Sequence, residues 1–239
     1  MSINVSKQLS VLADQCLLRT RREISSRSKH FITVQEQRLI NFAGNDYLGL
    51  SQDHRVRTAL ITGATHYGFG SGASPLLSGY SSAHHELEEY CAAFLQRDRA
   101  LLFNSGYHAN LGVITTFADR SNTIIADKEV HASIIDAIVL SRASHYRYRH
   151  QDLAHVEELL QQHSTDQPLL ISESVFSMSG AITDAAQLVT MANKYHAQLV
   201  LDDAHGFGVL GQHGRGISEH YSLHATDIPI LITPFGKAL

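Results

Sequence analysis

The sequence predicts an α/β protein whose sheet is mostly parallel and is covered by helices on both faces. Two observations lead to this prediction. Short runs dominated by Val, Ile and Leu, such as 123–126 and 169–171, alternate with longer segments whose apolar residues recur at helical spacing. The short runs are apolar throughout, which is typical of strands buried on both faces. Ligands of such sheets bind beyond the carboxyl ends of the strands, so the residues after each strand are the first candidates for a site.

The N-terminal part predicts a helix followed by extended segments. Leu9, Leu12 and Cys16 recur at helical spacing, so a helix is expected to about residue 25. The pattern then predicts extended segments at 31–34 and 38–42, a helix from about 54, and an amphipathic helix at 83–96 after a glycine-rich stretch. We expect residues 1–45 to form an N-terminal helix and extended segment, and 46–239 to form a large domain.

Beyond residue 100 the two kinds of pattern alternate. Apolar runs predict strands at 100–103, 123–126, 145–149, 168–174, 198–203 and 229–233. Helical spacing predicts helices at 133–141, 152–162 and 184–196, and a further helix opening at Gly106.

Composition excludes several classes of protein. With 239 residues, 44% of them hydrophobic, the chain can bury a substantial core in one large or two small domains. A formal net charge of −4 argues against a nucleic-acid partner. No apolar run approaches the roughly 20 residues of a membrane helix, and there is no apolar signal core. Cys16 and Cys91 lack ligand spacing and are expected to be reduced core residues, so we expect a cytoplasmic protein.

Candidate site residues follow four of the expected strands. They are Gly106 and Tyr107 after 100–103, Ser177 after 168–174, Asp202 and His205 at the end of 198–203, and Lys237 after 229–233. Because the carboxyl ends of parallel strands meet at one edge of a sheet, we expect these residues to converge on one pocket.

Their chemistry matches the needs of pyridoxal phosphate (PLP). This coenzyme requires an amine to form a Schiff base, a carboxylate to keep its ring nitrogen protonated, and donors for its phosphate and ring oxygen. Lys237, Asp202 and His205 supply the amine, the carboxylate and a donor to the ring oxygen. The backbone N–H groups of Gly106 and Tyr107, at a positive helix terminus, suit a phosphate.

A series of motifs supports the same coenzyme. The sequences NFAGNDYLGLS (41–51), GFGSGASPLLSGYSSAHHELE (68–88), LLFNSGYHAN (101–110), ADKEVHASI (126–134), ESVFSMSG (173–180), DDAHGFGVLG (202–211) and FGKAL (235–239) occur in this order. Together they closely resemble the α-oxoamine synthases, PLP enzymes that condense an amino acid with an acyl thioester and lose carbon dioxide. The resemblance covers essentially the whole chain. It implies the large domain of an aspartate-aminotransferase-type, fold type I, enzyme.

The resemblance assigns a role to each matching residue. Lys237 resembles the Schiff-base lysine, Asp202 the partner of the ring nitrogen, and His205 the donor to the ring oxygen. His131 resembles the histidine stacked on the coenzyme ring, with a helix-start residue as the alternative. Gly106, Tyr107 and Ser177 match coenzyme-contacting positions.

Substrate contacts are implied less specifically. Arg19 matches a substrate-contacting arginine, although Arg19, Arg21 and Arg22 also fit a solvated helix end. Asn45 and Glu173 resemble active-site residues, and His131 is placed to hydrogen-bond a substrate carboxylate or the developing acyl oxygen.

The motif SGYSSAH at 78–84 resembles the biotin-pathway branch of the family. The members of the family that use glycine as substrate usually carry Thr after the Gly of this motif, where this chain has Tyr80. The implied substrates are L-alanine and a pimeloyl thioester, on coenzyme A or acyl carrier protein, with a glycine-using synthase as the alternative. The implied assembly is a homodimer, with neither a nucleic-acid nor a membrane partner.

Two other classes were weighed. Gly68, Gly70 and Ala73 imitate the dinucleotide-binding fingerprint, but a helical pattern precedes them and no acidic strand end follows at the required distance. Asp202, Asp203 and His205 have the chemistry of a metal hydrolase, but HExxH and paired-ligand patterns are missing, so no metal is expected.

Two departures from the family pattern matter. Pro234 stands where the family often has a phosphate-binding Thr, and Thr233 lies one residue earlier and is the expected replacement. Relatives also continue beyond the equivalent of Leu239 into a small C-terminal domain. We expect that the chain lacks this domain, as a fragment or truncated gene product. We also expect that it binds PLP weakly or not at all, is inactive alone and is poorly soluble alone.

Overall fold

The structure is a computed structural model of the chain, and it describes residues 4–28, 30–163 and 167–238. These residues form two compact units, Met1–Gly44 and Asn45–Leu239.

The first unit begins with helix α1, Val5–Asp14, which ends earlier than the spacing predicts. Cys16 takes a left-handed backbone conformation with φ of 55°, and the Leu17 N–H donates to the Leu12 carbonyl oxygen at 2.8 Å. This pair of features is the Schellman arrangement that closes a helix. The expectation of a helix to residue 25 is therefore wrong, and Cys16 is exposed instead of lying in a core.

The rest of the first unit is a small antiparallel sheet in the order β1–β2–β3. Its strands are Ser26–Ser28, Phe31–Val34 and Gln37–Ile40. Val34 pairs with Gln37, so only Gln35 and Glu36 form the turn, and both have positive φ values of 46° and 64°. Two such residues give the two-residue turn whose twist matches a β-hairpin.

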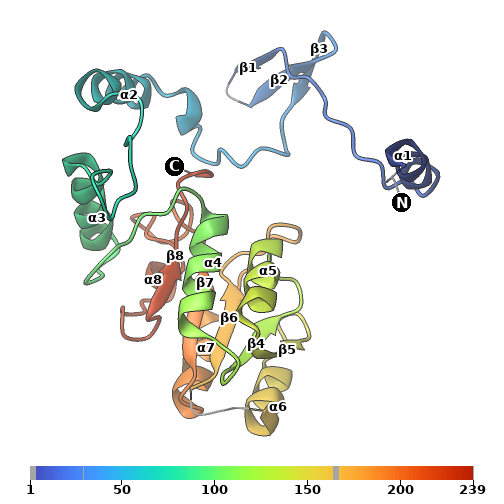
Figure 1. Cartoon of the computed structure of the whole chain (residues 1–239), viewed down its shortest axis with the longest axis vertical. Coiled ribbons are helices and arrows are strands. Elements are labelled where there is room, and N and C mark those ends of the chain that lie inside the picture. Colours follow the sequence, from blue (N-terminus) through green and yellow to red (C-terminus); the bar gives the residue numbers. More distant parts are fainter. Residues whose placement is uncertain (1–3, 29, 164–166, 239) are drawn as a thin grey trace. The chain divides into compact units, whose positions relative to one another are not determined.

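The second unit is built on a five-stranded parallel sheet in the order β5–β4–β6–β7–β8 (Figure 1). The strands are β4 Thr123–Asp127, β5 Ser144–Tyr148, β6 Leu169–Glu173, β7 Gln198–Asp202 and β8 Ile230–Ile232. The predicted parallel sheet is therefore confirmed.

The expected strand at 100–103 is wrong. The Leu102 N–H donates to the Glu88 side chain at 2.9 Å instead of entering a ladder. Within the described residues this segment pairs with no strand, because β8 forms the end of the sheet on that side. An apolar run alone does not make a strand, since the backbone also needs a partner.

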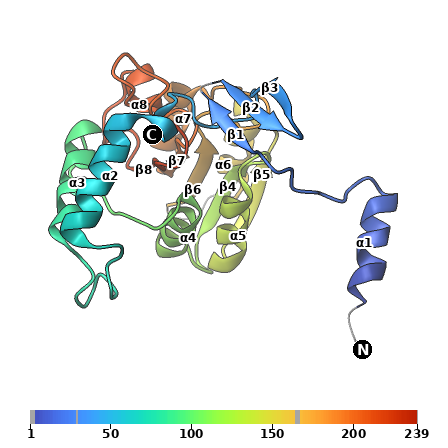
Figure 2. The ribbon, with the colours of Figure 1, turned by 90° about the horizontal axis from the view of Figure 1, so that it is seen from above.

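Successive residues of each strand pack into two different cores. Ile125, Leu170 and Leu201 pack with helices α6, Leu153–His163, and α7, Ala185–Lys194. Their neighbours along the strands pack on the other face with α4, Gly106–Phe117, and α5, Ala132–Ser141. Figure 2 shows α4 and α5 on one side of the sheet and α7 on the other. Burial on both faces explains why the central strands β4 and β6 are mostly apolar, whereas β5, with the sequence SHYRY at the edge of the sheet, is largely exposed.

Helices α2, His54–Tyr67, and α3, Ser82–Phe94, precede the sheet, with a short 3₁₀ helix at Leu50–Gln52. A four-residue helix, α8, Ile217–His220, lies between β7 and β8. Gly68 caps the C-terminus of α2, so the glycine-rich stretch follows a helix. The dinucleotide-binding fingerprint needs a strand at this place, and the structure therefore speaks against that alternative. No helix in the described part of the chain is long and apolar enough to cross a membrane.

The connections between strands reverse direction between β4 and β6. The chain moves outward from β4 to β5, returns to β6 on the other side of β4, and continues through β7 to β8. A crevice beyond the carboxyl ends at such a reversal is where open α/β sheets bind ligands.

Candidate active site

Two carboxylates end neighbouring strands at this edge. Glu173 is the last residue of β6 and is paired in register with Asp202, the last residue of β7. Both side chains are buried. Burial, with the nearby Asp202 charge as a second cause, raises the pKa of Glu173 to about 7.

Lys237 follows β8, and its amine interacts electrostatically with the Asp202 and Glu173 carboxylates. Burial lowers the pKa of the Lys237 ammonium, and the charges of Asp202 and Glu173 act against that shift. A lysine whose neutral form is favoured in this way is a better nucleophile and base than an exposed one.

Asp202 and Asp203 point to opposite faces of the sheet, as alternation along a strand requires. Asp202 accepts a hydrogen bond from the Asn110 side chain on α4 at 2.8 Å and another from the Ala204 N–H at 3.0 Å. Burial raises the pKa of Asp202, while these donors and Lys237 oppose the shift. Asp202 therefore belongs to the face covered by α4 and α5.

Asp203 serves the opposite side. It accepts hydrogen bonds from the Ser174 hydroxyl and from the Ile217 N–H at the start of α8, the latter at 2.9 Å. Any side chain at Gly216 would collide with it, because a Cβ there would lie 1.8 Å from the Asp203 carboxylate. Asp203 thus anchors the connection between β7 and β8.

Asp203 should also make stability depend on pH. Burial raises its pKa to about 7 from a reference value of 3.8. Between about pH 4 and pH 7 the native carboxyl then keeps a proton that the unfolded chain releases, so the free energy of unfolding falls as the pH rises through this window. Urea unfolding at several pH values should show that slope, and Asp203→Asn should flatten it. An equally steep slope in the variant would contradict this prediction.

His131 is held at the start of α5. Its backbone N–H donates to the Glu173 carboxylate. Its ring Nδ1 lies 2.7 Å from the Ser133 hydroxyl and accepts a hydrogen bond from the Ser133 backbone N–H at 3.2 Å. His131 is thus both the N-cap of α5, as the alternative reading of the sequence proposed, and an exposed ring beside the buried carboxylates. The two roles are compatible because capping uses only one ring nitrogen.

His205 lies half-buried after β7, and its Nδ1 is 2.6 Å from the Tyr47 hydroxyl. Burial, together with the positive charges of Lys237 and His131, lowers the pKa of His205 to about 4. The Asn45 side-chain oxygen lies 3.3 Å from the same hydroxyl, whose single hydrogen is donated either to Asn45 or to the His205 Nδ1. Asn45 therefore reaches the site through Tyr47.

The amino end of α4 lies against the segment after β8. Ser105 caps this helix by accepting a hydrogen bond from the His108 N–H at 3.2 Å. A Cβ on Gly106 would lie 3.2 Å from Pro234, so glycine permits the close approach. The N–H groups of the first turn of a helix have no partner within the helix, and they make this end an anion site.

Three further predicted residues have no contact with the buried carboxylates among the interactions described. The Tyr107 hydroxyl donates to Asp136 on α5. Ser177 is exposed in the turn after β6. Arg19 is exposed in the first unit.

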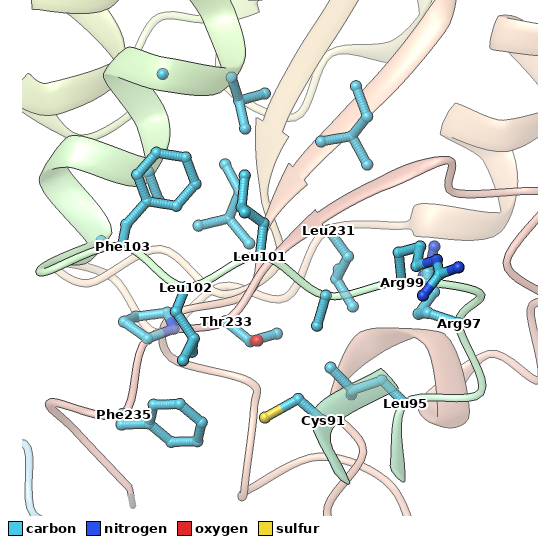
Figure 3. A pocket seen from close by; sticks show the side chains of 18 of the residues that line it. Cys91, Leu95, Arg97, Arg99, Leu101, Leu102, Phe103, Leu231, Thr233 and Phe235 are labelled. Carbon is cyan, nitrogen blue, oxygen red and sulfur yellow. The ribbon is translucent and has the colours of Figure 1, made fainter. Parts of the chain in front are cut away.

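A cavity of about 760 Å³ adjoins the candidate site (Figure 3). Its wall includes Leu101 and Phe103, the apolar residues of the segment that forms no strand, and Cys91 of α3. It shares Gly106 and Thr233 with the candidate site. The buried carboxylates and Lys237 do not line it, so we place the chemistry at the strand ends and not in this cavity.

Sequence reasoning missed Asn110, Ser133 and Tyr47. Each lies inside a motif that was recognised as a whole, namely LLFNSGYHAN, ADKEVHASI and NFAGNDYLGLS. Asn110 was detectable as a polar residue four positions after Gly106, on the buried side of an otherwise apolar helix. No group of three metal-ligating side chains occurs among the residues that the structure describes.

Comparison with known proteins agrees with the motif resemblance. A family model described as aminotransferase class I and II matches residues 37–239. The 8-amino-7-oxononanoate synthase of Methylococcus capsulatus is 41% identical over 239 residues, which are 100% of this chain and 62% of that protein.

Solved structures agree as well. Serine palmitoyltransferase (SPT) of Sphingomonas wittichii matches with a TM-score of 0.91 and 28% identity, over 99% of this chain and 61% of that one. A second SPT structure, which contains PLP, matches with a TM-score of 0.89, 28% identity, and 99% and 62% coverage. The 8-amino-7-oxononanoate synthase of Francisella tularensis matches with a TM-score of 0.71 and 36% identity, over 82% and 54%. The chain thus spans between 54% and 62% of the length of these proteins.

Proposed function

The chain belongs to the aminotransferase class I and II family, and from this membership we propose that it binds PLP and serves the decarboxylative condensation of an amino acid with an acyl thioester. One observation carries the proposal. Lys237 lies within electrostatic reach of Asp202 and Glu173 at the carboxyl ends of β6, β7 and β8. The reaction class also follows from the likeness to 8-amino-7-oxononanoate synthases.

The residues fit the coenzyme. Asp202 is a buried carboxylate held by donors, which suits a protonated ring nitrogen. The amino end of α4, which approaches Pro234 closely at Gly106, carries backbone N–H groups of the kind that bind a phosphate. Lys237 supplies the amine, and His131 and His205 supply ring contacts. Ser177 and Tyr107 remain proposed coenzyme contacts at the rim.

Each residue then has a chemical task. Bound PLP supplies an electron sink for the bond changes at the α-carbon of the amino acid. The lowered pKa of Lys237 favours its neutral amine, which would hold the coenzyme covalently and would serve as the general base toward the α-proton. Asp202 keeps a proton on the ring nitrogen by its charge.

The histidines orient the reacting groups. His205, whose low pKa keeps it neutral, presents its ring to the coenzyme oxygen while Tyr47 holds its Nδ1. His131, whose ring is exposed beside the buried carboxylates, is our proposed donor to a substrate carboxylate or to the developing acyl oxygen. Arg19 and Asn45 remain proposed substrate contacts.

We propose L-alanine and a pimeloyl thioester as substrates, with 8-amino-7-oxononanoate as the product. The supports are the motif at 78–84 and the likeness to enzymes of that name. The acyl carrier is coenzyme A or acyl carrier protein. A glycine-using synthase is the second candidate, and product mass from parallel reactions with alanine and glycine separates the two. We further propose a cytoplasmic homodimer.

Coenzyme binding is tested directly by reduction. The purified chain mixed with PLP should acquire a visible absorption band, and borohydride should remove the band and leave a stable adduct. Peptide mass spectrometry should place that adduct on Lys237. A dinucleotide enzyme or a metal hydrolase would give neither the band nor the adduct, and an adduct on Lys128 or Lys194 would refute the assignment.

Thr233→Ala tests whether the Thr233 hydroxyl binds the coenzyme phosphate. In the family a Thr at the position of Pro234 often has this role. The substitution should weaken PLP binding by roughly tenfold to a hundredfold, the worth of one hydrogen bond to a charged group. Thr116→Ala is the matched control, because Thr116 lines the same cavity while its hydroxyl bonds only to the Gly112 carbonyl oxygen. Unchanged affinity in Thr233→Ala would assign this strand end a purely structural role.

A further inference from the structure

Asn110 links two parts of the candidate site that lie far apart in the sequence. It is buried on α4, and its amide nitrogen donates to Asp202 on β7 at 2.8 Å and to the Ser133 hydroxyl oxygen at 3.0 Å. Ser133 lies in the first turn of α5, next to the His131 ring. One side chain thus bridges a strand end and a helix start.

The orientation of the amide is determined by its surroundings. Both N–H groups of Asn110 are used, whereas its Oδ1 is buried without a hydrogen-bond partner in the described part of the chain. Turning the amide over would place Oδ1 against the Asp202 carboxylate, where two acceptors repel each other. A buried unsatisfied acceptor is unfavourable, so the two donations outweigh that cost.

This orientation gives the chain of hydrogen bonds a direction. Since the Ser133 oxygen accepts from Asn110, its own hydrogen is left to donate to the His131 Nδ1, 2.7 Å away. The Ser133 N–H donates to the same nitrogen at 3.2 Å. A ring nitrogen that accepts from two donors carries no hydrogen, so the neutral ring has its hydrogen on Nε2.

We propose that Asn110 is a positioning residue that, through Ser133, joins the Asp202 carboxylate to the His131 ring and sets the Nε2–H tautomer of His131. Asp202 and His131 are the two groups that the proposed function places at the ring nitrogen and over the ring, so the catalytic meaning of the link rests on that function. The link itself belongs to the protein and exists without the coenzyme. Its consequence is that His131 always offers an N–H donor to the site.

The first test needs no coenzyme. In the ¹⁵N-labelled chain, the two ring nitrogens of His131, assigned with a His131→Gln variant, should show hydrogen on Nε2. Ser133→Ala should give a mixture of tautomers, and Asn110→Ala should move the Nδ1 shift in the same direction. Ser141→Ala is the control, because Ser141 is also buried on α5 but bonds to the Ile138 carbonyl oxygen at the other end of the helix. The wild-type ring decides by itself if the variants do not fold, since hydrogen on Nδ1 would overturn the proposal.

The second test uses the coenzyme. Asn110→Ala should weaken PLP binding by roughly tenfold to a hundredfold, as expected when a buried carboxylate loses a hydrogen bond. It should also shift the pH profile of the visible band, as Asp202→Asn does, whereas Ser141→Ala should do neither. An Asn110→Ala variant that matched wild type in both the tautomer and the pH profile would overturn the proposal. A chain that takes up no PLP even when it is extended by a relative's C-terminal part refutes the proposed function, while the tautomer measurement still decides on the link.

Discussion

Lys237→Ala is expected to abolish the covalent attachment of PLP and, in a chain extended by a relative's C-terminal part, to remove the catalytic activity that depends on it. Lys237 is half-buried, and its amine interacts electrostatically with the Asp202 and Glu173 carboxylates. Loss of a general base alone costs about 10²- to 10⁴-fold in rate, and loss of the covalent bond adds to this. Borohydride reduction followed by intact-mass measurement should show an adduct on the wild-type chain and none on the variant.

Lys194→Ala is the matched control for that experiment. Lys194 lies on α7 and forms an exposed ion pair with Glu157 at 2.5 Å, away from the strand ends. Its loss should leave both the adduct and the visible band unchanged. A Lys237→Ala chain that still forms a reducible adduct in the wild-type yield would show that the coenzyme is attached elsewhere.

Asp202→Asn is expected to weaken PLP binding by roughly tenfold to a hundredfold, whereas Asp203→Asn should leave affinity close to wild type. Asp202 faces α4, and we propose that its negative charge holds a proton on the ring nitrogen of the coenzyme. An amide there removes the charge and turns one of its two acceptors into a donor. Fluorescence or absorbance titration with PLP measures the affinity of each variant.

Asp203→Asn separates chemistry from folding in this comparison. Asp203 faces the opposite side and bonds to Ser174 and to the start of α8, so its loss should appear in the pH dependence of unfolding. Both variants must therefore be compared at a pH where each is folded, as checked by circular dichroism. Equal losses of affinity would mean that strand alternation does not separate the two roles.

Most elements of the sheet could be predicted from periodicity because burial on both faces leaves a strong local signal. The runs at 123–126 and 198–203 became β4 and β7 with shifts of one residue at their ends. The run at 100–103 is also apolar but forms no strand, because pairing depends on a neighbour that is remote in sequence. The N-terminal helix was predicted too long, because Cys16 adopts a left-handed conformation that hydrophobic spacing does not reveal.

The candidate site divides in a similar way. The residue types and their order along the chain were enough to single out Lys237, Asp202 and His205, because a coenzyme with fixed chemical needs restricts which side chains can serve it. Their placement at strand ends followed from the parallel sheet. Whether they hold PLP remains the proposal that reduction and mass spectrometry test.

By itself, the sequence determined the α/β class, the position of the site along the chain and the chemistry that its residues can perform, since these depend on composition, period and residue type. Only the tertiary structure decided that Asn110 lies between Asp202 and Ser133, that Tyr47 holds His205, and that burial changes the pKa of Glu173, His205 and Lys237. The physical reason is that hydrogen-bond partners and solvent exclusion come from segments that fold together across the sheet edge, and no local pattern records them.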